Sequence, residues 1–539
     1  MKLGAAISAL LRQYGVEHVF GIPGVHTLEL FRDIETSGVE MVVPRHEQGA
    51  GYMADAYSRV TGRPGVCYLI TGPGVTNAMT PIAQAWHDST PLLVIASTVE
   101  RAQFDAHRGT LHDTPDLAEV LRPFTLISEN ATSAEHAVRV IDEAFARWRT
   151  ERPRPVYLGI PLDLLAEEVG ELTRPALAAA PSAASAAAPT LPAAAASLLS
   201  AAERPVIIAG GGARHDGPAV AELAERLTAP VILTGNAKGL LAADHPLFAG
   251  VSGFFPSAHR LLESADLVIA LGTEIADSEG FVAPPVGPRL PRILRVDIDP
   301  AATHPQQPNP PIVMRVAEFA AAALAQLPEQ SGESIEAGHA HAAEVRTELA
   351  EALAESPYGP WITAIEHAIP ADTVLAADSA QVAYQSHALL RLDTPGRWLA
   401  PYGFGTLGPA LPMAIGAAVG APGRPVVALS GDGGSLFTLT ELATLADLDA
   451  AVVVVIWDNG GYGEIEKSFE REGIRPAGVR ASARDLAAIA RGFGIHAVDV
   501  TEPAGLETEL RAAIERRGPA VIVVAAPEGL RVSGGLRAG

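Results

Sequence analysis

The segment RPVVALSGDGGS (residues 424–435) decides the fold, because an apolar run ends there in a glycine-rich turn that carries an acidic residue. A second segment, AAVVVVIWDNGGYG (450–463), repeats the arrangement, and Asn459 lies 27 positions after Asp432. Short apolar runs bounded by glycine are typical of buried parallel strands, so we expect both side chains at strand ends. Mg²⁺ accepts one or two protein oxygens when phosphate and water complete its shell of about six ligands. The pattern therefore predicts a metal site that holds a diphosphate.

Similar short apolar runs recur along the chain, separated by segments of helical length. They lie at residues 66–70, 92–96, 156–160, 206–209, 231–233, 267–271, 293–298, 374–376, 426–429, 451–457 and 520–524. This alternation predicts an α/β fold of mostly parallel sheets with helices on both faces. The Ala-, Pro- and Ser-rich segment 173–189 and the polar segment 329–349 break the rhythm, and we predict that both are linkers. Three doubly wound domains follow, at 1–172, 190–328 and 350–539.

Composition narrows the class of protein. The chain has 539 residues, 48% of them apolar and 19% charged, which predicts a globular protein. Its formal net charge of −23 argues against nucleic acid as a partner, since phosphate binding needs clustered Lys and Arg. The single cysteine, Cys67, excludes an intrachain disulfide and favours a reducing, cytoplasmic location. No apolar run approaches the roughly 20 residues that span a bilayer, so we expect a soluble protein and no membrane partner.

Residues 431–463 resemble the cofactor motif of thiamin-diphosphate enzymes, in the branch that holds acetohydroxyacid synthases and 2-oxo acid decarboxylases. The resemblance implies that Asp432, Asn459 and the main-chain carbonyl of Gly461 bind Mg²⁺. The family usually has Asn where this chain has Asp458, and that departure leaves the ligand position 459 intact. The three expected domains also match the family's order of pyrimidine-binding, central and diphosphate-binding domains.

The same resemblance assigns residues to the diphosphate side of the cofactor. Backbone amides around Gly433 and Gly434 are expected to meet the diphosphate. Ser379 and Gln381 lie in a segment similar to a diphosphate-side loop, although two neighbouring positions differ from the family's usual Gly and His. Contacts in this second loop therefore stay open.

Two further segments resemble the parts that hold the pyrimidine and bend the cofactor. RHEQGA (45–50) implies that Glu47 contacts the aminopyrimidine, where a carboxyl group helps the cofactor lose its thiazolium C2 proton. FGTLG (404–408) implies that Leu407 wedges under the cofactor and that the carbonyl of Gly405 accepts a hydrogen bond from it. Taken alone, Glu47 is also explained as a solvated charge at a helix start, and Leu407 as an ordinary core residue.

Candidates on the substrate side begin with GIPGVHT (21–27), a loop that the family turns toward the reacting carbon. Val25 stands where some decarboxylases carry Asp and others Ser, and a valine cannot transfer protons. His26 or His112 could do so, because an imidazole with a pKa near 6.5 can protonate a carbanion at neutral pH. A lone histidine is more often structural or exposed, so the proton donor stays open.

Glu464 suggests the substrate class, since it lies five residues after Asn459, at a position that is commonly apolar in related decarboxylases. A carboxylate there would pair well with a guanidinium that donates two hydrogen bonds. The surrounding residues resemble those of 5-guanidino-2-oxopentanoate (2-ketoarginine) decarboxylases and imply a cationic 2-oxo acid. The alternative is a solvent-facing Glu464 paired with Lys467 or an arginine.

We therefore predict an enzyme that uses thiamin diphosphate and Mg²⁺ to decarboxylate a 2-oxo acid to an aldehyde. The alternatives are carboligation, in which a second 2-oxo acid is added as in acetohydroxyacid synthase, and a non-catalytic protein that keeps the fold. FAD is not expected, because residues 272–277 lack the arginine with which acetohydroxyacid synthases bind it. The family builds its site between two chains, which implies a homodimer or homotetramer.

Overall fold

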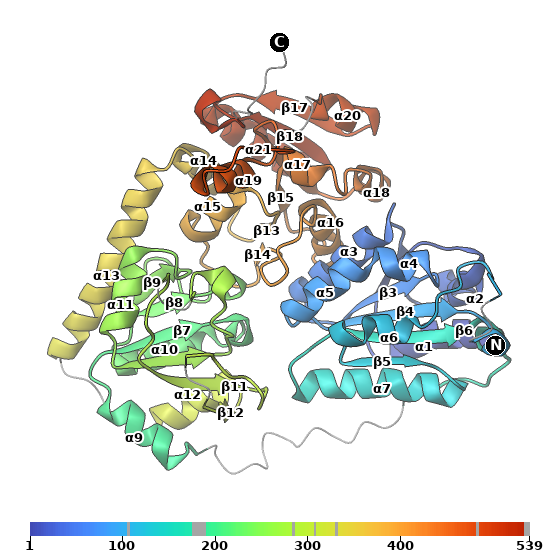
Figure 1. Cartoon of the computed structure of the whole chain (residues 1–539), viewed down its shortest axis with the longest axis horizontal. Coiled ribbons are helices and arrows are strands. Elements are labelled where there is room, and N and C mark those ends of the chain that lie inside the picture. Colours follow the sequence, from blue (N-terminus) through green and yellow to red (C-terminus); the bar gives the residue numbers. More distant parts are fainter. Residues whose placement is uncertain are drawn as a thin grey trace.

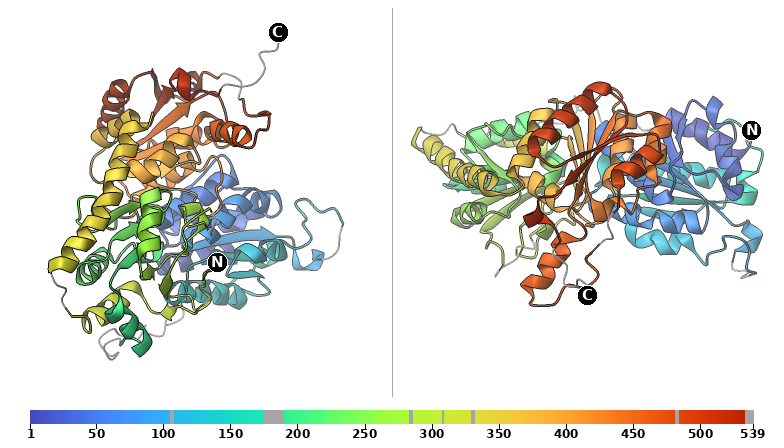
Figure 2. Two further views of the ribbon diagram at one scale, coloured as in Figure 1. Left: turned by 60° about the vertical axis from the view of Figure 1, so that its left-hand side comes forward. Right: turned by 90° about the horizontal axis from the view of Figure 1, so that it is seen from above.

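Three domains, each built on a six-stranded parallel sheet, make up the protein in a computed structural model (Figure 1). The structure describes residues 1–104, 108–174, 190–282, 286–306, 309–328, 332–480 and 484–532. Seen from above, the third domain lies over the junction of the other two (Figure 2, right). Within the described ranges, no helix is both long and apolar enough to cross a bilayer.

The first domain carries a sheet of order β2-β1-β3-β4-β6-β5. Its strands are β1 His18–Gly21, β2 Glu40–Val42, β3 Gly65–Leu69, β4 Leu92–Thr98, β5 Ile127–Asn130 and β6 Val156–Pro161. Its helices are α1 Leu3–Gln13, α2 Leu28–Phe31, α3 Glu47–Thr61, α4 Pro73–Asn77, α5 Met79–His87, α6 Leu117–Leu121, α7 Ala134–Thr150 and α8 Leu162–Leu165. Strands β3, β4 and β6 are buried throughout, as expected for parallel strands covered on both faces.

The central domain has a sheet of order β12-β11-β10-β7-β8-β9. Its strands are β7 Pro205–Ala209, β8 Val231–Leu233, β9 Phe248–Val251, β10 Leu267–Leu271, β11 Arg292–Asp297 and β12 Ile312–Val313. Its helices are α9 Ala193–Ala201, α10 Gly217–Leu227, α11 Pro256–Ser264 and α12 Val316–Leu324. The apolar clusters on the two faces of this sheet are separate, so the domain has the covered-sheet architecture that the sequence predicts.

The third domain has a sheet of order β14-β13-β15-β16-β18-β17. Its strands are β13 Val374–Ala377, β14 Trp398–Leu399, β15 Val426–Gly431, β16 Val452–Asp458, β17 His496–Val500 and β18 Ala520–Ala525. Its helices are α14 Gly359–Ala368, α15 Gln381–Leu389, α16 Ala410–Gly420, α17 Asp432–Ser435, α18 Glu441–Leu448, α19 Gly463–Arg471, α20 Leu486–Gly492 and α21 Pro503–Arg516. The prediction of three α/β domains with mostly parallel sheets is confirmed.

The structure describes most of one expected linker and almost none of the other. Segment 173–189 lies almost entirely outside the described residues. Most of segment 329–349 is not an irregular linker but part of helix α13 (Gly332–Glu355), which runs along the outer side from the central to the third domain (Figure 1). Only Gly338, Ala342 and Val345 of this helix are buried, so too few apolar positions repeat to signal a helix in the sequence.

The first domain is joined to the third by the contact between α3 and α16. At Gly416 a side chain of any size would overlap the backbone carbonyl of Met53, so the two helices touch through their main chains. One apolar cluster continues across this contact and includes Tyr52 and Ala56 of the first domain with Met413 and Ala417 of the third. The contact therefore acts as a shared core between two domains.

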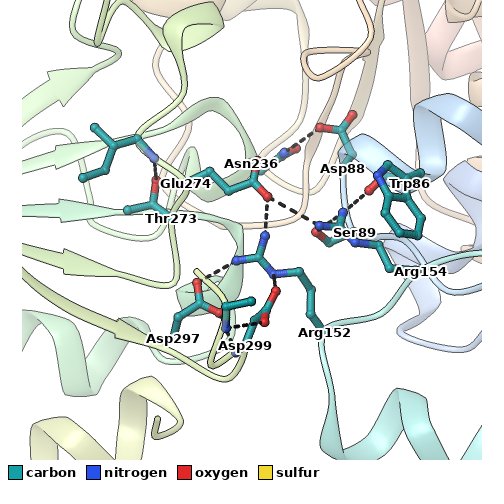
Figure 3. A network of polar contacts seen from close by, with 12 residues as sticks. Trp86, Asp88, Ser89, Arg152, Arg154, Asn236, Thr273, Glu274, Asp297 and Asp299 are labelled. Carbon is teal, nitrogen blue, oxygen red and sulfur yellow. Dashed lines mark hydrogen bonds and ion pairs between the residues drawn. The ribbon is translucent and has the colours of Figure 1, made fainter. Parts of the chain in front are cut away.

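Charged groups join the first domain to the central domain. Arg152, in the chain leading to β6, directs its guanidinium at three carboxylates of the central domain (Figure 3). It contacts Glu274, lies 2.8 Å from Asp297 and 3.6 Å from Asp299. Arg154 lies over the ring of Trp86 and donates to its backbone carbonyl. This cluster fixes the two domains side by side.

Arg59 of α3 connects all three domains from a fully buried position. Its guanidinium pairs with Asp55 at 2.9 Å and Asp88 at 2.8 Å, both in the first domain. It also donates to Asn236 of the central domain at 3.4 Å and to the carbonyl of Ala400 of the third at 3.3 Å. Removing this one cation would leave two buried carboxylates facing each other.

We predict that Arg59→Met lowers the free energy of unfolding by about 3–5 kcal/mol, because Asp55 and Asp88 lose the cation that compensates their burial. Urea unfolding followed by tryptophan fluorescence would measure the change. Arg122→Met is the matched control, since Arg122 pairs with Glu119 at an exposed position and its loss should leave the transition unchanged. Equal midpoints for the two variants would contradict the role given to Arg59.

Candidate functional site

Asp432 and Asn459 lie side by side at the carboxyl edge of the third sheet. Strands β15 and β16 pair in parallel with Gly431 opposite Trp457, so the residues that follow each strand emerge together. Both side chains are buried. The backbone N–H of Asn459 donates to the Asp432 carboxylate, and the amide oxygen of Asn459 accepts the N–H of Gly461 at 3.2 Å. The structure thus brings together the three residues predicted to bind the metal.

The charge at Asp432 is costly without a cation. Burial, followed by the nearby Asp458 carboxylate, raises the pKa of Asp432 to about 6, against the opposing effect of the Gly433 and Asn459 N–H groups. A carboxylate, an amide oxygen and a carbonyl are the donors that hard divalent cations take in proteins. Among the described residues, no cluster of three or more His, Cys, Asp and Glu side chains offers another metal site. The residues present here fit Mg²⁺ held together with a diphosphate.

The glycines after Asp432 leave room only for main chain. A Cβ at Gly433 would lie 2.7 Å from the ring of Tyr462, and one at Gly434 would lie 2.7 Å from Asp378 Oδ2. Gly433 and Gly434 lie in the first turn of α17, where N–H groups have no acceptor within the helix and favour an anion. The turn therefore suits the diphosphate contact expected there.

Asp378 is a residue that the sequence analysis missed. Its fully buried carboxylate accepts the N–H of Ser379 at 2.8 Å, the N–H of Gly408 at 3.0 Å and the hydroxyl of Ser430 at 2.9 Å. Ser379 and Gly408 belong to two separate loops, and Ser430 lies near the end of strand β15. Burial raises the pKa of Asp378 to about 6. Its place two residues after the apolar run 374–376 was the one available signal.

The loop 404–408 contacts Ser379, just after strand β13, and Tyr52 of helix α3. Ser379 Oγ donates to the carbonyl of Thr406 at 3.0 Å, and the Thr406 hydroxyl lies 2.7 Å from the hydroxyl of Tyr52 on α3. Leu407 is only half-buried, so it is not an ordinary core residue. Gly405 has φ +64° and borders a cavity, and an added Cβ there would meet no atom within 4 Å.

A cavity of about 590 Å³ lies between the third and central domains. Its walls include Phe254, Phe255, Ser379, Tyr384, Tyr402, Gly405 and Glu464. Three residues predicted for the cofactor or the substrate therefore border one space. The aromatic side chains from the central domain and from α15 were not anticipated, because no short motif marks them.

Glu464 and Gln381 connect this cavity to the metal residues. Gln381 accepts a hydrogen bond from Asn459 Nδ2 at 3.4 Å, and its own Nε2 donates to Glu464 at 3.5 Å. The Glu464 carboxylate also pairs with Arg471 at 2.9 Å, with side chains 44% and 67% exposed. The structure is consistent with both alternatives for Glu464. The residue lines the cavity, as a substrate-binding residue would, and it also pairs with an arginine.

The predicted residues of the first domain form a second group. Glu47 opens α3 and accepts a hydrogen bond from Asn77 Nδ2 at 2.9 Å. His26 and His112 are neighbours, with their Nδ1 atoms 3.1 Å apart. Burial, then the charge of His112, lowers the pKa of His26. Val25, beside them, is 76% exposed.

The two groups do not meet within one chain. In the part of the chain that the structure describes, no hydrogen bond or ion pair joins Glu47, His26 or His112 to Asp432 or Asn459. The sequence resemblance implies that a second copy of the chain brings such groups together.

The central domain borders another cavity, of about 510 Å³, against the first domain. Gly211, Gly212 and Thr273 line it, together with Arg152 and Glu274. The Glu274 carboxylate neutralises Arg152 at this mouth (Figure 3). The Arg152 guanidinium is thereby engaged by carboxylates of the central domain.

Comparisons with known proteins agree with this geometry. Residues 1–120 match the thiamine pyrophosphate enzyme N-terminal TPP binding domain, residues 192–326 the central domain and residues 378–524 the C-terminal TPP binding domain. The chain belongs to the thiamine pyrophosphate enzymes, thiamine pyrophosphate being another name for thiamin diphosphate. The predictions of the family and of an enzyme that uses this cofactor are confirmed.

Relatives that match almost the whole chain show which members of the family it resembles. The chain is 42% identical to a probable 2-ketoarginine decarboxylase of Pseudomonas aeruginosa, over 97% of this chain and 93% of the relative. It is 31% identical to the acetolactate synthase isozyme 1 large subunit of Escherichia coli, over 95% of this chain and 92% of that protein. A probable acetolactate synthase large subunit of Methanocaldococcus jannaschii is 29% identical over 96% of this chain.

We predict that Gly434→Ala weakens thiamin diphosphate binding by about 5- to 150-fold, the equivalent of an overpacking cost of about 1–3 kcal/mol. The added methyl group would displace Asp378 and with it the two loops that this carboxylate joins to the end of β15. Calorimetric titration with the cofactor and Mg²⁺ would measure the affinity. Gly492→Ala, at the end of α20 with open space around it, is the control and should bind normally. Unchanged affinity in Gly434→Ala would refute the organising role of Asp378.

Proposed function

We propose that the protein is a Mg²⁺- and thiamin-diphosphate-dependent decarboxylase that converts a cationic 2-oxo acid, such as 5-guanidino-2-oxopentanoate, to its aldehyde. The observation that carries the proposal is the Glu464 carboxylate on the wall of the 590 Å³ cavity, linked through Gln381 to Asn459. The similarity to a probable 2-ketoarginine decarboxylase supports it independently.

The metal and cofactor would be held by the residues at the third sheet edge. Asp432, Asn459 and the carbonyl of Gly461 would bind Mg²⁺, and the N–H groups of Gly433 and Gly434 would meet the diphosphate. Bound thiamin diphosphate supplies a carbon nucleophile for the 2-oxo group and an electron sink for the departing carboxylate. Glu47 would hold a proton at its carboxyl group against the aminopyrimidine, while Leu407 and Gly405 would orient the ring system.

Glu464 would bind the cationic end of the substrate. Arg471 already places a guanidinium on this carboxylate and so stands in for the guanidinium of the substrate. The Arg471 pair is exposed, and such a pair contributes only about 0–1 kcal/mol. A substrate guanidinium on the cavity side can therefore share or replace it, with aromatic walls such as Tyr384 alongside.

Proton delivery would fall to the histidine pair of the first domain. An Nδ1 to Nδ1 distance of 3.1 Å requires one ring to donate and the other to accept, so His26 and His112 share a proton. The lowered pKa of His26 makes its protonated imidazolium a stronger acid than an ordinary histidine. Such an imidazolium suits transfer of its proton to a carbanion, which leaves the neutral ring.

A homodimer or homotetramer is part of the proposal, because each group of site residues needs a partner. Exposed apolar side chains accompany both groups: Val25 and Leu111 lie near the histidine pair, and Phe437 and Ile465 lie near the metal residues. Contact between these surfaces on two copies would bury the apolar side chains and join Glu47 to the cofactor.

Acetolactate formation is the second candidate, because two of the relatives named above are acetolactate synthases. The two reactions share the cofactor and differ in whether a proton or a second 2-oxo acid completes turnover. Glu464 favours the decarboxylase, since pyruvate has no cationic tail to pair with it.

The test is a panel of 2-oxo acids with detection of aldehyde, acetolactate and CO₂. We expect aldehyde from 5-guanidino-2-oxopentanoate, with pyruvate and neutral branched acids at least about tenfold slower in kcat/KM. Removal of Mg²⁺ with a chelator should abolish turnover, and added Mg²⁺ should restore it. Acetolactate from pyruvate as the main product would reject the decarboxylase assignment. Absence of turnover on any acid despite tight cofactor binding would favour a non-catalytic protein.

We predict that Glu464→Leu lowers kcat/KM for the guanidino acid by about 10- to 100-fold, as expected from losing hydrogen bonds to a charged group. The apolar side chain should at the same time improve turnover of neutral branched 2-oxo acids. Glu470→Leu, an exposed carboxylate on the same helix, is the control and should keep the wild-type ranking. An unaltered ranking in Glu464→Leu would show that this carboxylate does not read the substrate.

A further inference from the structure

Glu441, the first residue of α18 in the third domain, is a fully buried carboxylate outside the site described above. It accepts the backbone N–H of Arg45 at 3.1 Å and the backbone N–H of His46 at 3.0 Å. The hydroxyl of Thr444 donates to its second oxygen at 2.7 Å. A carboxylate from one domain thus holds two main-chain groups of another.

The two peptide groups that Glu441 holds come directly before Glu47. Glu47 is the first residue of α3, and the N–H groups at a helix start have no partner within the helix. A negative charge at this end is also favoured by the helix dipole. The side chain of Glu47 is held separately by Asn77 of α4. Glu441 therefore fixes the backbone of Glu47, and Asn77 fixes its carboxyl group.

The carboxylate of Glu441 packs closely against the first turn of α3. A Cβ on Gly49 would overlap Glu441 Oε1, so the carboxylate lies directly against the helix. Burial raises the pKa of Glu441, and the bonds from Thr444 and from the N–H groups of Arg45 and His46 oppose that rise. The side chain of Arg45 turns to Asp447 at the surface.

We propose that Glu441 is a positioning residue that sets the place of Glu47 against the cofactor. The inference rests on the proposed function, in which Glu47 meets the aminopyrimidine. Proton handling depends steeply on geometry, and a displacement of about 1 Å can cost about 100-fold in rate. A helix start that is free to move would leave the cofactor bound through its diphosphate and misplace only the carboxyl group of Glu47.

The test compares variants that remove the acceptor with one that keeps it. Glu441→Leu removes both oxygens, and Gly49→Ala displaces the carboxylate without changing any charge. Both should lower kcat by about 10- to 100-fold while the dissociation constant for thiamin diphosphate and KM change less than about threefold. Glu441→Gln keeps one acceptor oxygen and should retain turnover within about fivefold of wild type.

A second measurement uses the cofactor-free protein and needs no activity. Amide hydrogen exchange of the backbone around Arg45 and His46 should be at least about tenfold faster in Glu441→Leu and Gly49→Ala than in wild type. Asp447→Asn is the matched control, because it removes the surface contact to Arg45 and leaves the carboxylate of Glu441 in place. Its exchange and its kcat should match those of wild type.

The outcomes separate this inference from the proposed function. Glu47→Gln should abolish turnover with normal cofactor binding and normal exchange. If Glu47→Gln is inactive but Gly49→Ala and Glu441→Leu keep wild-type kcat and exchange, the positioning inference fails alone. The positioning inference also fails if the kcat of Gly49→Ala and Glu441→Leu falls only in proportion to a loss of cofactor affinity. If Glu47→Gln turns over at the wild-type rate, the role proposed for Glu47 is wrong, whatever Glu441 does.

Discussion

Parallel pairing of β15 with β16 is the constraint on which the rest of the site depends. Because the strands run in the same direction and in register, their ends place Asp432 and Asn459 together although the two residues are 27 positions apart in the chain. The glycines that follow let the main chain turn at once, so both side chains stay at the sheet edge. In open parallel sheets, ligands bind outside the carboxyl ends of the strands.

Three carboxylates of the third domain, those of Asp378, Asp432 and Glu441, are buried, and each has different partners around it. Asp378 is held by N–H and hydroxyl groups of the third domain, and Glu441 by N–H groups of the first domain with a hydroxyl of its own. Asp432 lies beside Asp458 and keeps a raised pKa. Burial raises the pKa of all three carboxylates, but only Asp432 has a second carboxylate, Asp458, that raises its pKa further. A cation held there would compensate both charges, which supports the proposal that Asp432 binds the metal.

Much of the fold could be predicted from the sequence, because buried parallel strands read as short apolar runs. The run at 426–429 falls within β15, and the run at 451–457 lies within β16 except for its first residue. The turn residues follow these strands directly in the sequence. Helix α13 could not be predicted, since it is mostly exposed and buries only three residues. Motif spacing brings out residues that follow strands, such as Asp432. It gives no sign of pairs such as Arg45 and Glu441, which are 396 positions apart and meet only through packing of α3 on the third domain.

The proposed site is divided between two domains whose residues are far apart in the sequence. The first domain supplies Glu47 and the histidine pair, and the third supplies the metal residues and Glu464, yet α3 also packs on α16 of its own chain. The start of α3 is therefore held by the third domain of its own chain through Glu441. In the proposed dimer, Glu47 would act on a cofactor bound to the third domain of the other chain. The contact within the chain would then be the fixed reference that positions the carboxyl group of Glu47.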